Sequence, residues 1–138
     1  MVVPKFRAWV EAEETMHPVL SLDWSGIDDN LTVFVPMGHT SSRAVSIDNA
    51  VLMQSTGLFS TFSEDELFED DVIFWTYFDE FEDTGKARIV YRDGCWKLLD
   101  IKTGKETWDS LFDCLENCTV FLSGNIYENP ELEEATND

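Results

Sequence analysis

The dipeptide Asp93-Gly94 is the strongest local constraint on the fold. Residues of these two types occupy the central positions of tight hairpin turns, where the backbone needs positive φ angles. Apolar and polar residues alternate on either side of the dipeptide, which is typical of strands with one face in a core. A two-residue turn here gives the cross-strand pairs Tyr91 with Trp96 and Ile89 with Leu98. The sequence therefore predicts an antiparallel hairpin over residues 88–99.

The first half of the chain shows the same two-residue period in three short segments. Their apolar positions are Phe6, Ala8 and Val10, then Leu20, Leu22 and Trp24, then Leu31, Val33 and Val35. Turn-forming Gly, Asn, Asp and Ser residues separate the segments. This pattern favours a meander of antiparallel strands.

One later segment follows the spacing of a helix. Trp108, Leu111, Phe112 and Leu115 lie at positions i, i+3, i+4 and i+7. This spacing predicts a short helix over residues 107–116, with Thr107 as its N-cap. Residues 119–122 then read as a last core strand. The fold class is accordingly α+β, mainly β, with one short C-terminal helix.

Length and composition favour one domain. A chain of 138 residues with 43% apolar residues can bury one core and is short for two. We expect a compact domain over residues 1–130, with 1–58 and 59–130 as its sub-parts if it divides. The acidic residues 131–138 have little to bury and are expected to form a mobile tail.

The charge balance excludes several classes of partner. The chain has 28 acidic and 9 basic residues, a formal net charge of -19. This charge repels polyphosphates and anionic lipid headgroups, so we expect no direct binding of nucleic acid or membranes. The first seven residues lack the pattern of a secretory signal, which favours the cytoplasm.

The sequence contains no recognisable catalytic motif. The histidines His17 and His39 stand apart from any nucleophile motif, and the scattered glycines form no phosphate-binding loop. Cys114 and Cys118 lack the second pair of ligands that a zinc site needs. The carboxylates around Glu69 do not follow the spacing of a calcium loop. We therefore expect no enzyme activity, catalytic residue, metal or cofactor, and a carboxylate-based metal-dependent enzyme is the least favoured alternative.

The aromatic run Phe74, Trp75, Tyr77 and Phe78 has two interpretations. It could line a ligand pocket, or it could belong to a strand that is covered on both faces. Core packing is the favoured interpretation.

Four segments together resemble one family. They are Lys5-Phe6-Arg7-Ala8-Trp9, Leu52-Met53-Gln54-Ser55-Thr56-Gly57-Leu58, Glu69-Asp70-Asp71-Val72-Ile73 and Gly124-Asn125-Ile126-Tyr127-Glu128-Asn129-Pro130-Glu131-Leu132. In this order and at these distances they are similar to the YopX family of phage and prophage proteins. The resemblance implies a phage origin, a β-rich fold with a small SH3-like barrel portion in its second half, and no established enzymatic activity.

The chain departs from this family pattern at three places. Ser55 stands where the family commonly has Tyr, and Asp70 stands where it usually has Gly. The backbone is therefore expected to turn differently at Asp70. Residues 59–68 replace a loop that is often rich in Lys, Asn and Gly, and they bring acids and phenylalanines instead.

Residues 44–85 contain 11 acids, eight aromatic residues and no Lys or Arg. Such an interval could simply be a solvated face. It could also complement a basic groove on another protein and speed association by long-range attraction. The residues expected to contact a partner are Phe62, Glu64, Asp65, Glu66, Phe68, Glu69, Asp70, Asp71, Glu80 and Asp83.

These observations lead to a functional hypothesis centred on residues 59–71. The chain is expected to be a non-catalytic acidic phage protein of the host cytoplasm that engages a basic host protein. The partner would be a nucleic-acid-handling or defence complex, inhibited through occupation of its nucleic-acid groove. The alternative is a phage structural or assembly accessory protein that forms homo-oligomers through sheet edges.

Overall fold

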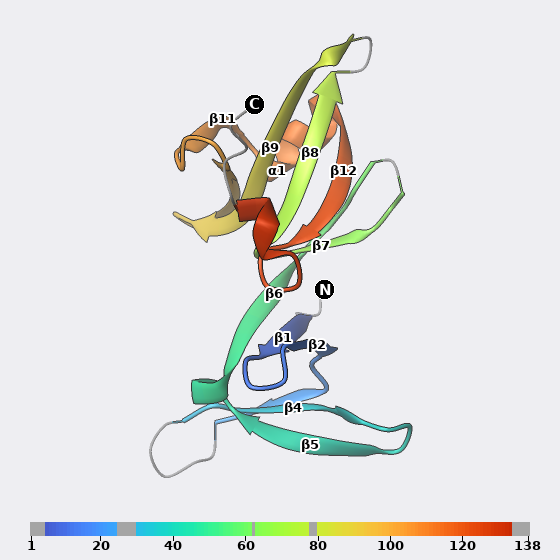
Figure 1. Cartoon of the computed structure of the whole chain (residues 1–138), viewed down its shortest axis with the longest axis vertical. Helices are drawn as coiled ribbons and strands as arrows, with labels where there is room; N and C mark the ends of the chain where they lie inside the picture. Colours follow the sequence, from blue (N-terminus) through green and yellow to red (C-terminus); the bar gives the residue numbers. More distant parts are fainter. Residues whose placement is uncertain (1–4, 25–29, 62, 78–79, 134–138) are drawn as a thin grey trace. The chain divides into compact units, whose positions relative to one another are not determined.

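The computed structural model describes residues 5–24, 30–61, 63–77 and 80–133 (Figure 1). The fold is mostly antiparallel β-sheet with one α-helix, as the sequence predicts, and part of the sheet forms a half-barrel. The chain divides into two compact units, Met1–Gln54 and Ser55–Asp138. This division falls four residues before the boundary expected between the two sub-parts. The predicted tail lies outside the described residues beyond position 133.

The first unit is built from short antiparallel strands. They are β1 (Phe6–Val10), β2 (Thr15–Pro18), β3 (Ser21–Asp23), β4 (Thr32–Met37), β5 (Ser41–Ser46) and the first half of β6 (Ala50–Phe59), which follows the short 3-10 helix η1 (Ile47–Asn49). β1 pairs with β2 and β6, and β4 pairs with β3 and β5. The core side chains are Ala8, Val10, Val33, Val35, Val45 and Ala50. Two of the three alternating segments thus supply core residues as predicted.

The remaining alternating segment, with Leu20, Leu22 and Trp24, contributes less to the core than its pattern predicts. β3 is only three residues long and lies at the edge of the β3-β4-β5 sheet. Leu22 packs against the core, whereas Leu20 and Trp24 on either side are exposed. Leu20 lies just before the start of β3 and Trp24 just after its end.

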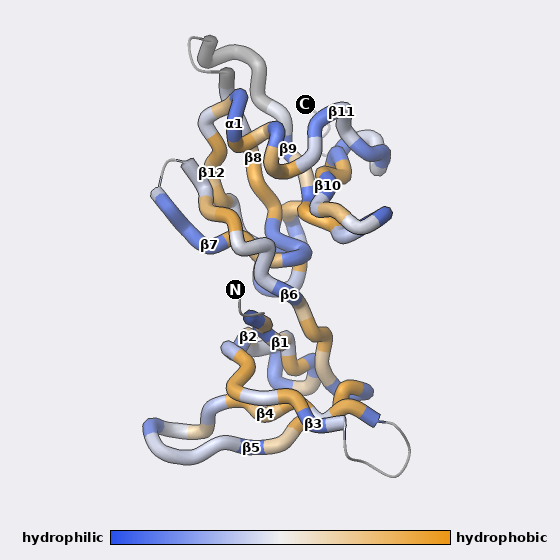
Figure 2. The backbone as a smooth tube through the Cα atoms, turned by 180° about the vertical axis from the view of Figure 1, so that it is seen from behind, coloured by the Kyte–Doolittle hydropathy of each residue, from blue (hydrophilic) through white to orange (hydrophobic). Residues whose placement is uncertain are grey.

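The second unit is a five-stranded antiparallel sheet with additions. Its elements are the end of β6, β7 (Glu66–Phe68), β8 (Asp71–Tyr77), β9 (Glu80–Arg92), β10 (Cys95–Asp100), β11 (Glu106–Ser110), α1 (Leu111–Asn117), β12 (Cys118–Asn125) and the 3-10 helix η2 (Pro130–Glu133). The strand order is β11-β10-β9-β8-β12. Figure 2 shows that β8, which lies between β9 and β12, is largely apolar.

The hairpin predicted at Asp93-Gly94 joins β9 to β10. Asp93 has a φ of 54° and Gly94 a φ of 78°, as a tight two-residue hairpin turn requires. The register pairs Tyr91 with Trp96 and continues with Ile89 opposite Leu98. This prediction is confirmed to the residue.

The helix prediction is wrong at its N-terminal end. Residues 106–110 form strand β11, and the helix begins at Leu111 with Ser110 as its N-cap. Leu111 and Cys114 face the core, so the buried stripe begins three residues later than predicted. Trp108 and Phe112 are exposed. The stripe that starts at Trp108 and the stripe that starts at Leu111 both have helical spacing. The pairing of β11 with β10 decides which of them is buried.

Two aromatic residues of β8, Phe74 and Trp75, pack against neighbouring strands, whereas the side chain of Tyr77 lies outside the described part of the structure. The Phe74 ring stacks on that of Phe121 from β12, with centroids 4.7 Å apart. Trp75 lies opposite Gly85, and its indole occupies the space that a Cβ would need there. These contacts favour packing over a ligand pocket for both residues. Phe78 lies outside the described residues.

A candidate partner-binding face

The hairpin of β6 and β7 carries the segment that the sequence singles out. Ser55 pairs with Phe68 and Phe59 with Glu66, with an irregularity in the register between them. Thr56 Oγ1 donates to the backbone oxygen of Leu67 at 2.7 Å and holds the two strands together at this point. The two strands therefore present residues 60–65 as the loop at their end.

Ser60 organises this loop from within. Its side chain is buried, and its Oγ accepts a hydrogen bond from the backbone N–H of Asp65 at 3.0 Å. In return the Ser60 N–H donates to the Asp65 carbonyl at 2.9 Å. Glu64, between them, has a φ of 55°, a conformation that side-chain-bearing residues rarely adopt. The two hydrogen bonds between Ser60 and Asp65 therefore close the loop.

Thr61 fixes the same loop to the edge of the sheet. Its N–H donates to the Val120 carbonyl of β12 at 3.2 Å, and the Val120 N–H donates to Thr61 Oγ1 at 2.5 Å. These bonds satisfy backbone groups that an edge strand would otherwise expose. They also restrain the loop, so its side chains lose less freedom when a partner binds.

The exposed acids of the face are Glu64 and Asp65. Glu66, Phe68 and Glu69 are half-buried, and Glu66 accepts a hydrogen bond from Ser55 Oγ at 2.6 Å. Phe62 lies outside the described residues. The side chains of Glu80 and Asp83, on the described backbone of β9, also lie outside them.

Asp70 and Asp71 are buried, so the prediction that they contact a partner is wrong. Their exposed fractions are 7% and 1%, so neither offers a useful surface to a partner. Asp71 Oδ2 accepts a hydrogen bond from the Phe68 N–H at 2.7 Å. Asp70 accepts from Arg88 Nε at 3.0 Å and from the Tyr127 hydroxyl at 3.2 Å. Both carboxylates therefore stabilise the turn that leads into β8.

Phe59 is a surface residue that the predicted contact set omits. Its side chain is 52% exposed. Together with Ser60, Thr61 and Glu64 it lines a shallow hollow at the end of the hairpin. Its position at the end of a strand, directly before an acidic loop, was the available signal. The hollow therefore combines the apolar surface of Phe59 with the carboxylate of Glu64.

The backbone at Asp70 takes a conformation that glycine also favours. Asp70 has a φ of 70°, which is the left-handed conformation that glycine adopts most easily. Its N–H donates to the Ile89 carbonyl at 2.9 Å, and its own carbonyl accepts from Ile126 at 3.3 Å. Aspartate tolerates this conformation better than most residues. The two side-chain bonds of its carboxylate favour it further.

The last family segment forms a tight turn against Asp70. Asn125 is buried, and its Oδ1 accepts from the N–H groups of Tyr127 and Glu128 at 3.0 and 2.8 Å. Burial, reinforced by the Asp70 carboxylate, raises the pKa of Tyr127 to about 12. The third and fourth family segments therefore meet in the second unit.

The first two family segments meet in the first unit. The first forms most of β1 and the second forms most of β6, where Ala8 pairs with Leu52. Arg7 Nε donates to the sulfur of Met53 at 3.4 Å. All four segments therefore hold the fold together, and the exposed acidic loop lies outside them.

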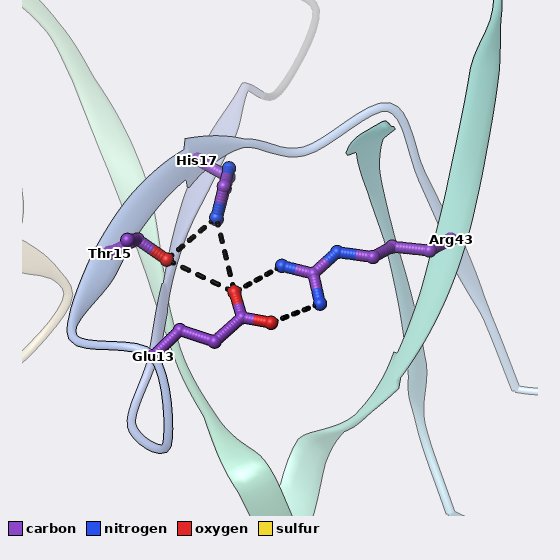
Figure 3. A network of polar contacts seen from close by, with 4 residues as sticks. All are labelled: Glu13, Thr15, His17 and Arg43. Atoms are coloured by element: carbon purple, nitrogen blue, oxygen red, sulfur yellow. Dashed lines mark hydrogen bonds and ion pairs between the residues drawn. The ribbon is translucent and has the colours of Figure 1, made fainter. Parts of the chain in front are cut away.

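The first unit contains a polar network, shown in Figure 3. The Arg43 guanidinium donates two hydrogen bonds to the Glu13 carboxylate, and these lower the pKa of Glu13. Thr15 Oγ1 lies 2.8 Å from His17 Nε2. The network ties the turn after β1 to strand β5. The network lies on the surface and stabilises the contact between these two segments.

The buried thiol of Cys114 is chemically unreactive in this fold. Burial, with Cys118 nearby, raises the pKa of Cys114 to about 12, so its thiol stays protonated and is a poor nucleophile. Within residues 5–24, 30–61, 63–77 and 80–133, no three His, Cys, Asp or Glu side chains gather in a group that could hold a metal. No helix in the described part of the chain is long and apolar enough to span a membrane.

Comparison with known proteins identifies the family. The model of the YopX protein family matches residues 5–134. The chain belongs to the YopX family. Among curated proteins, none shows a significant sequence match.

Two solved structures share the fold of this YopX-family protein. YopX from Bacillus subtilis superposes with a TM-score of 0.65 at 21% identity, covering 96% of this chain and 97% of its own. Protein EF1440 from Enterococcus faecalis gives a TM-score of 0.63 at 24% identity, covering 97% and 100%. The likeness at this identity concerns the fold. It extends over both units of the chain.

Proposed function

We propose that this YopX-family protein is a non-catalytic binding protein that engages a basic surface of a host protein. The observation that carries the proposal is the loop of residues 60–65, which is bonded to β12 through Thr61 and exposes Glu64 and Asp65. A net charge of -19 would attract a positively charged partner over a long range. The exposed Phe59 beside these acids would supply an apolar contact.

The partner that fits this face is a protein with a groove for nucleic acid. Such grooves are lined by Lys and Arg, whose phosphate contacts dominate their affinity. A protein that presents carboxylates from a fixed loop can occupy the groove and compete with the nucleic acid. We therefore propose a host nucleic-acid-handling or defence complex as the target, and inhibition by occupation as the effect. A phage or prophage origin would account for the role.

Affinity capture tests the proposal. The tagged protein is incubated with host lysate at low and at high salt, and the eluted proteins are identified by mass spectrometry. We expect a nucleic-acid-binding protein to be retained at low salt and released at high salt, because screening weakens exposed charge pairs. Nuclease treatment of the lysate beforehand excludes indirect capture through nucleic acid. Retention that is independent of salt would contradict the proposal.

A further inference from the structure

Trp108 is the most exposed large apolar side chain in the described part of the second unit. Its relative exposure is 103%, so folding buries none of its indole. Phe112, four residues later at the start of α1, is 56% exposed. Tryptophan is the residue type most enriched where proteins bind each other tightly. Trp108 is therefore a candidate contact for a partner.

Trp108 borders a hollow of about 480 Å³ on the β11 side of the sheet. The lining residues are Lys97, Glu106, Thr107, Trp108, Asp109, Ser110 and Asp113. β11 is the edge strand at the opposite end of the strand order from β12, to which the acidic loop is bonded. The hollow is therefore a separate surface of the same unit.

The bases at this hollow are already paired. Lys97 Nζ lies 3.2 Å from Asp93 Oδ2 and 3.6 Å from Glu106 Oε2, and the Asp93 hydrogen bond raises the pKa of Lys97. Arg92 also approaches Glu106, at 3.6 Å. The charge of Glu106 is thus shared between two bases.

The remaining acids leave the hollow negative. Asp113 accepts a hydrogen bond from Ser110 Oγ at 3.1 Å but pairs with no base among the described residues. Asp109, next to Trp108 in the sequence, is exposed; its charge helps to raise the pKa of the Cys114 and Cys118 thiols, and it forms no ion pair with a base in the described part of the chain. An incoming cation would therefore find two carboxylates that are not paired with Lys97, the base that lines the same hollow.

We infer that the hollow beside Trp108 takes an arginine side chain from a basic segment of a partner protein. A guanidinium is planar, so it can stack on the indole face of Trp108, and the carboxylates that line the same hollow would attract its charge. The inference rests on the proposed function for the basic nature of the partner, and it adds a second surface and a preferred residue. A second copy of this chain is disfavoured as the occupant, because each copy carries -19.

Peptide titration tests this surface. Fluorescein-labelled hexa-arginine and hexa-lysine, which carry equal charge, are titrated against the full chain at constant moderate salt and followed by anisotropy. We expect hexa-arginine to bind more tightly than hexa-lysine, because the lysine ammonium lacks the planar stacking surface. Trp108→Ala should weaken hexa-arginine binding by about fivefold, the order expected for loss of one cation–π contact.

Two further variants make the test specific. Trp24→Ala removes a 63% exposed tryptophan of the first unit and should leave the affinity unchanged. Both Trp variants keep the net charge, so a difference between them reports a local contact. Asp109→Asn should weaken hexa-arginine more than hexa-lysine. Thermal unfolding checks that each variant remains folded, as expected for exposed positions.

Four outcomes would overturn the inference. They are the absence of saturable hexa-arginine binding to the wild type, equal affinity for the two peptides, equal affinity of Trp108→Ala and the wild type, and a wild-type dimer that Trp108→Ala dissociates in light scattering. The last would assign the surface to a second copy. Failure of the proposed function is a separate result, because it is read from capture of the host protein and from charge reversal at Glu64 and Asp65.

Discussion

Arg88 Nε donates a hydrogen bond to Asp70 Oδ1 at 3.0 Å, across the turn in which Asp70 holds a φ of 70°. A left-handed residue with a side chain costs roughly 1 kcal/mol relative to glycine. A hydrogen bond between charged groups contributes about 1.5–3 kcal/mol. The bond therefore outweighs the backbone cost. This explains how an acid can occupy a position where the family usually has glycine.

Substitution of Asp70 should separate these two effects. Asp70→Ala loses both side-chain bonds and keeps the backbone cost, so we expect it to lower the free energy of unfolding by about 2–3 kcal/mol. Asp70→Gly loses the bonds but relieves the backbone, and should be about 1 kcal/mol more stable than Asp70→Ala. Urea denaturation followed by tryptophan fluorescence measures both. Equal stability of Asp70→Gly and Asp70→Ala would contradict this account.

Gly85 should not tolerate a side chain. A Cβ at this position would lie 2.0 Å from Cζ2 of the Trp75 ring. The indole would have to move, so Gly85→Ala should destabilise the protein by about 1–3 kcal/mol. In a Trp75→Leu background the same substitution should cost less, because the ring is gone. Additive losses in this double-mutant cycle would show that the two residues do not interact.

Tyr127 should make stability fall at alkaline pH. Its folded pKa is raised to about 12, above the value of about 10 for an unfolded tyrosine. The unfolded chain therefore loses this proton first, and the stabilisation present below pH 10 disappears as pH rises through the folded pKa. Ultraviolet titration should show a late phenolate that Tyr127→Phe removes. Tyr127→Phe should also show a weaker decline of stability above pH 10; an unchanged decline would assign the effect elsewhere.

Thr61 should matter for binding as well as stability. Thr61→Val removes the hydroxyl that accepts the Val120 N–H, which should cost about 1 kcal/mol of unfolding free energy. Because the loop then orders on binding, affinity for the captured partner should also fall. Val120 exchange protection, measured by hydrogen exchange, should drop in this variant. Thr40→Val, in the first unit, is the control and should leave affinity for the partner unchanged.

Strand period and turn chemistry predicted much of the fold because both act locally. Asp93-Gly94 needs only its own φ angles to set the register of β9 and β10. The start of the helix was harder to predict, because the apolar residues that follow Trp108 and those that follow Leu111 both have helical spacing, and only one set packs against the sheet. That choice was made by the pairing of Lys97 with Ser110, a contact between segments.

The candidate site was predictable only in part, for a related reason. Charge density singled out residues 59–71 as a segment rich in acids. It could not separate the exposed Glu64 and Asp65 from the buried Asp70 and Asp71. That separation depends on Arg88, which approaches Asp70 from a strand 18 residues later.

The affinity of the captured partner for charge-reversed variants tests the central claim most directly. Glu64→Lys combined with Asp65→Lys changes the net charge by the same amount as Glu11→Lys combined with Asp48→Lys, which alters exposed acids of the first unit. We predict that the first pair weakens binding at least tenfold, about 1.4 kcal/mol. It should also flatten the salt dependence, whereas the second pair should change both only slightly. Equal effects of the two pairs would show that the acidic loop acts only through the overall charge of the protein, and would contradict the account.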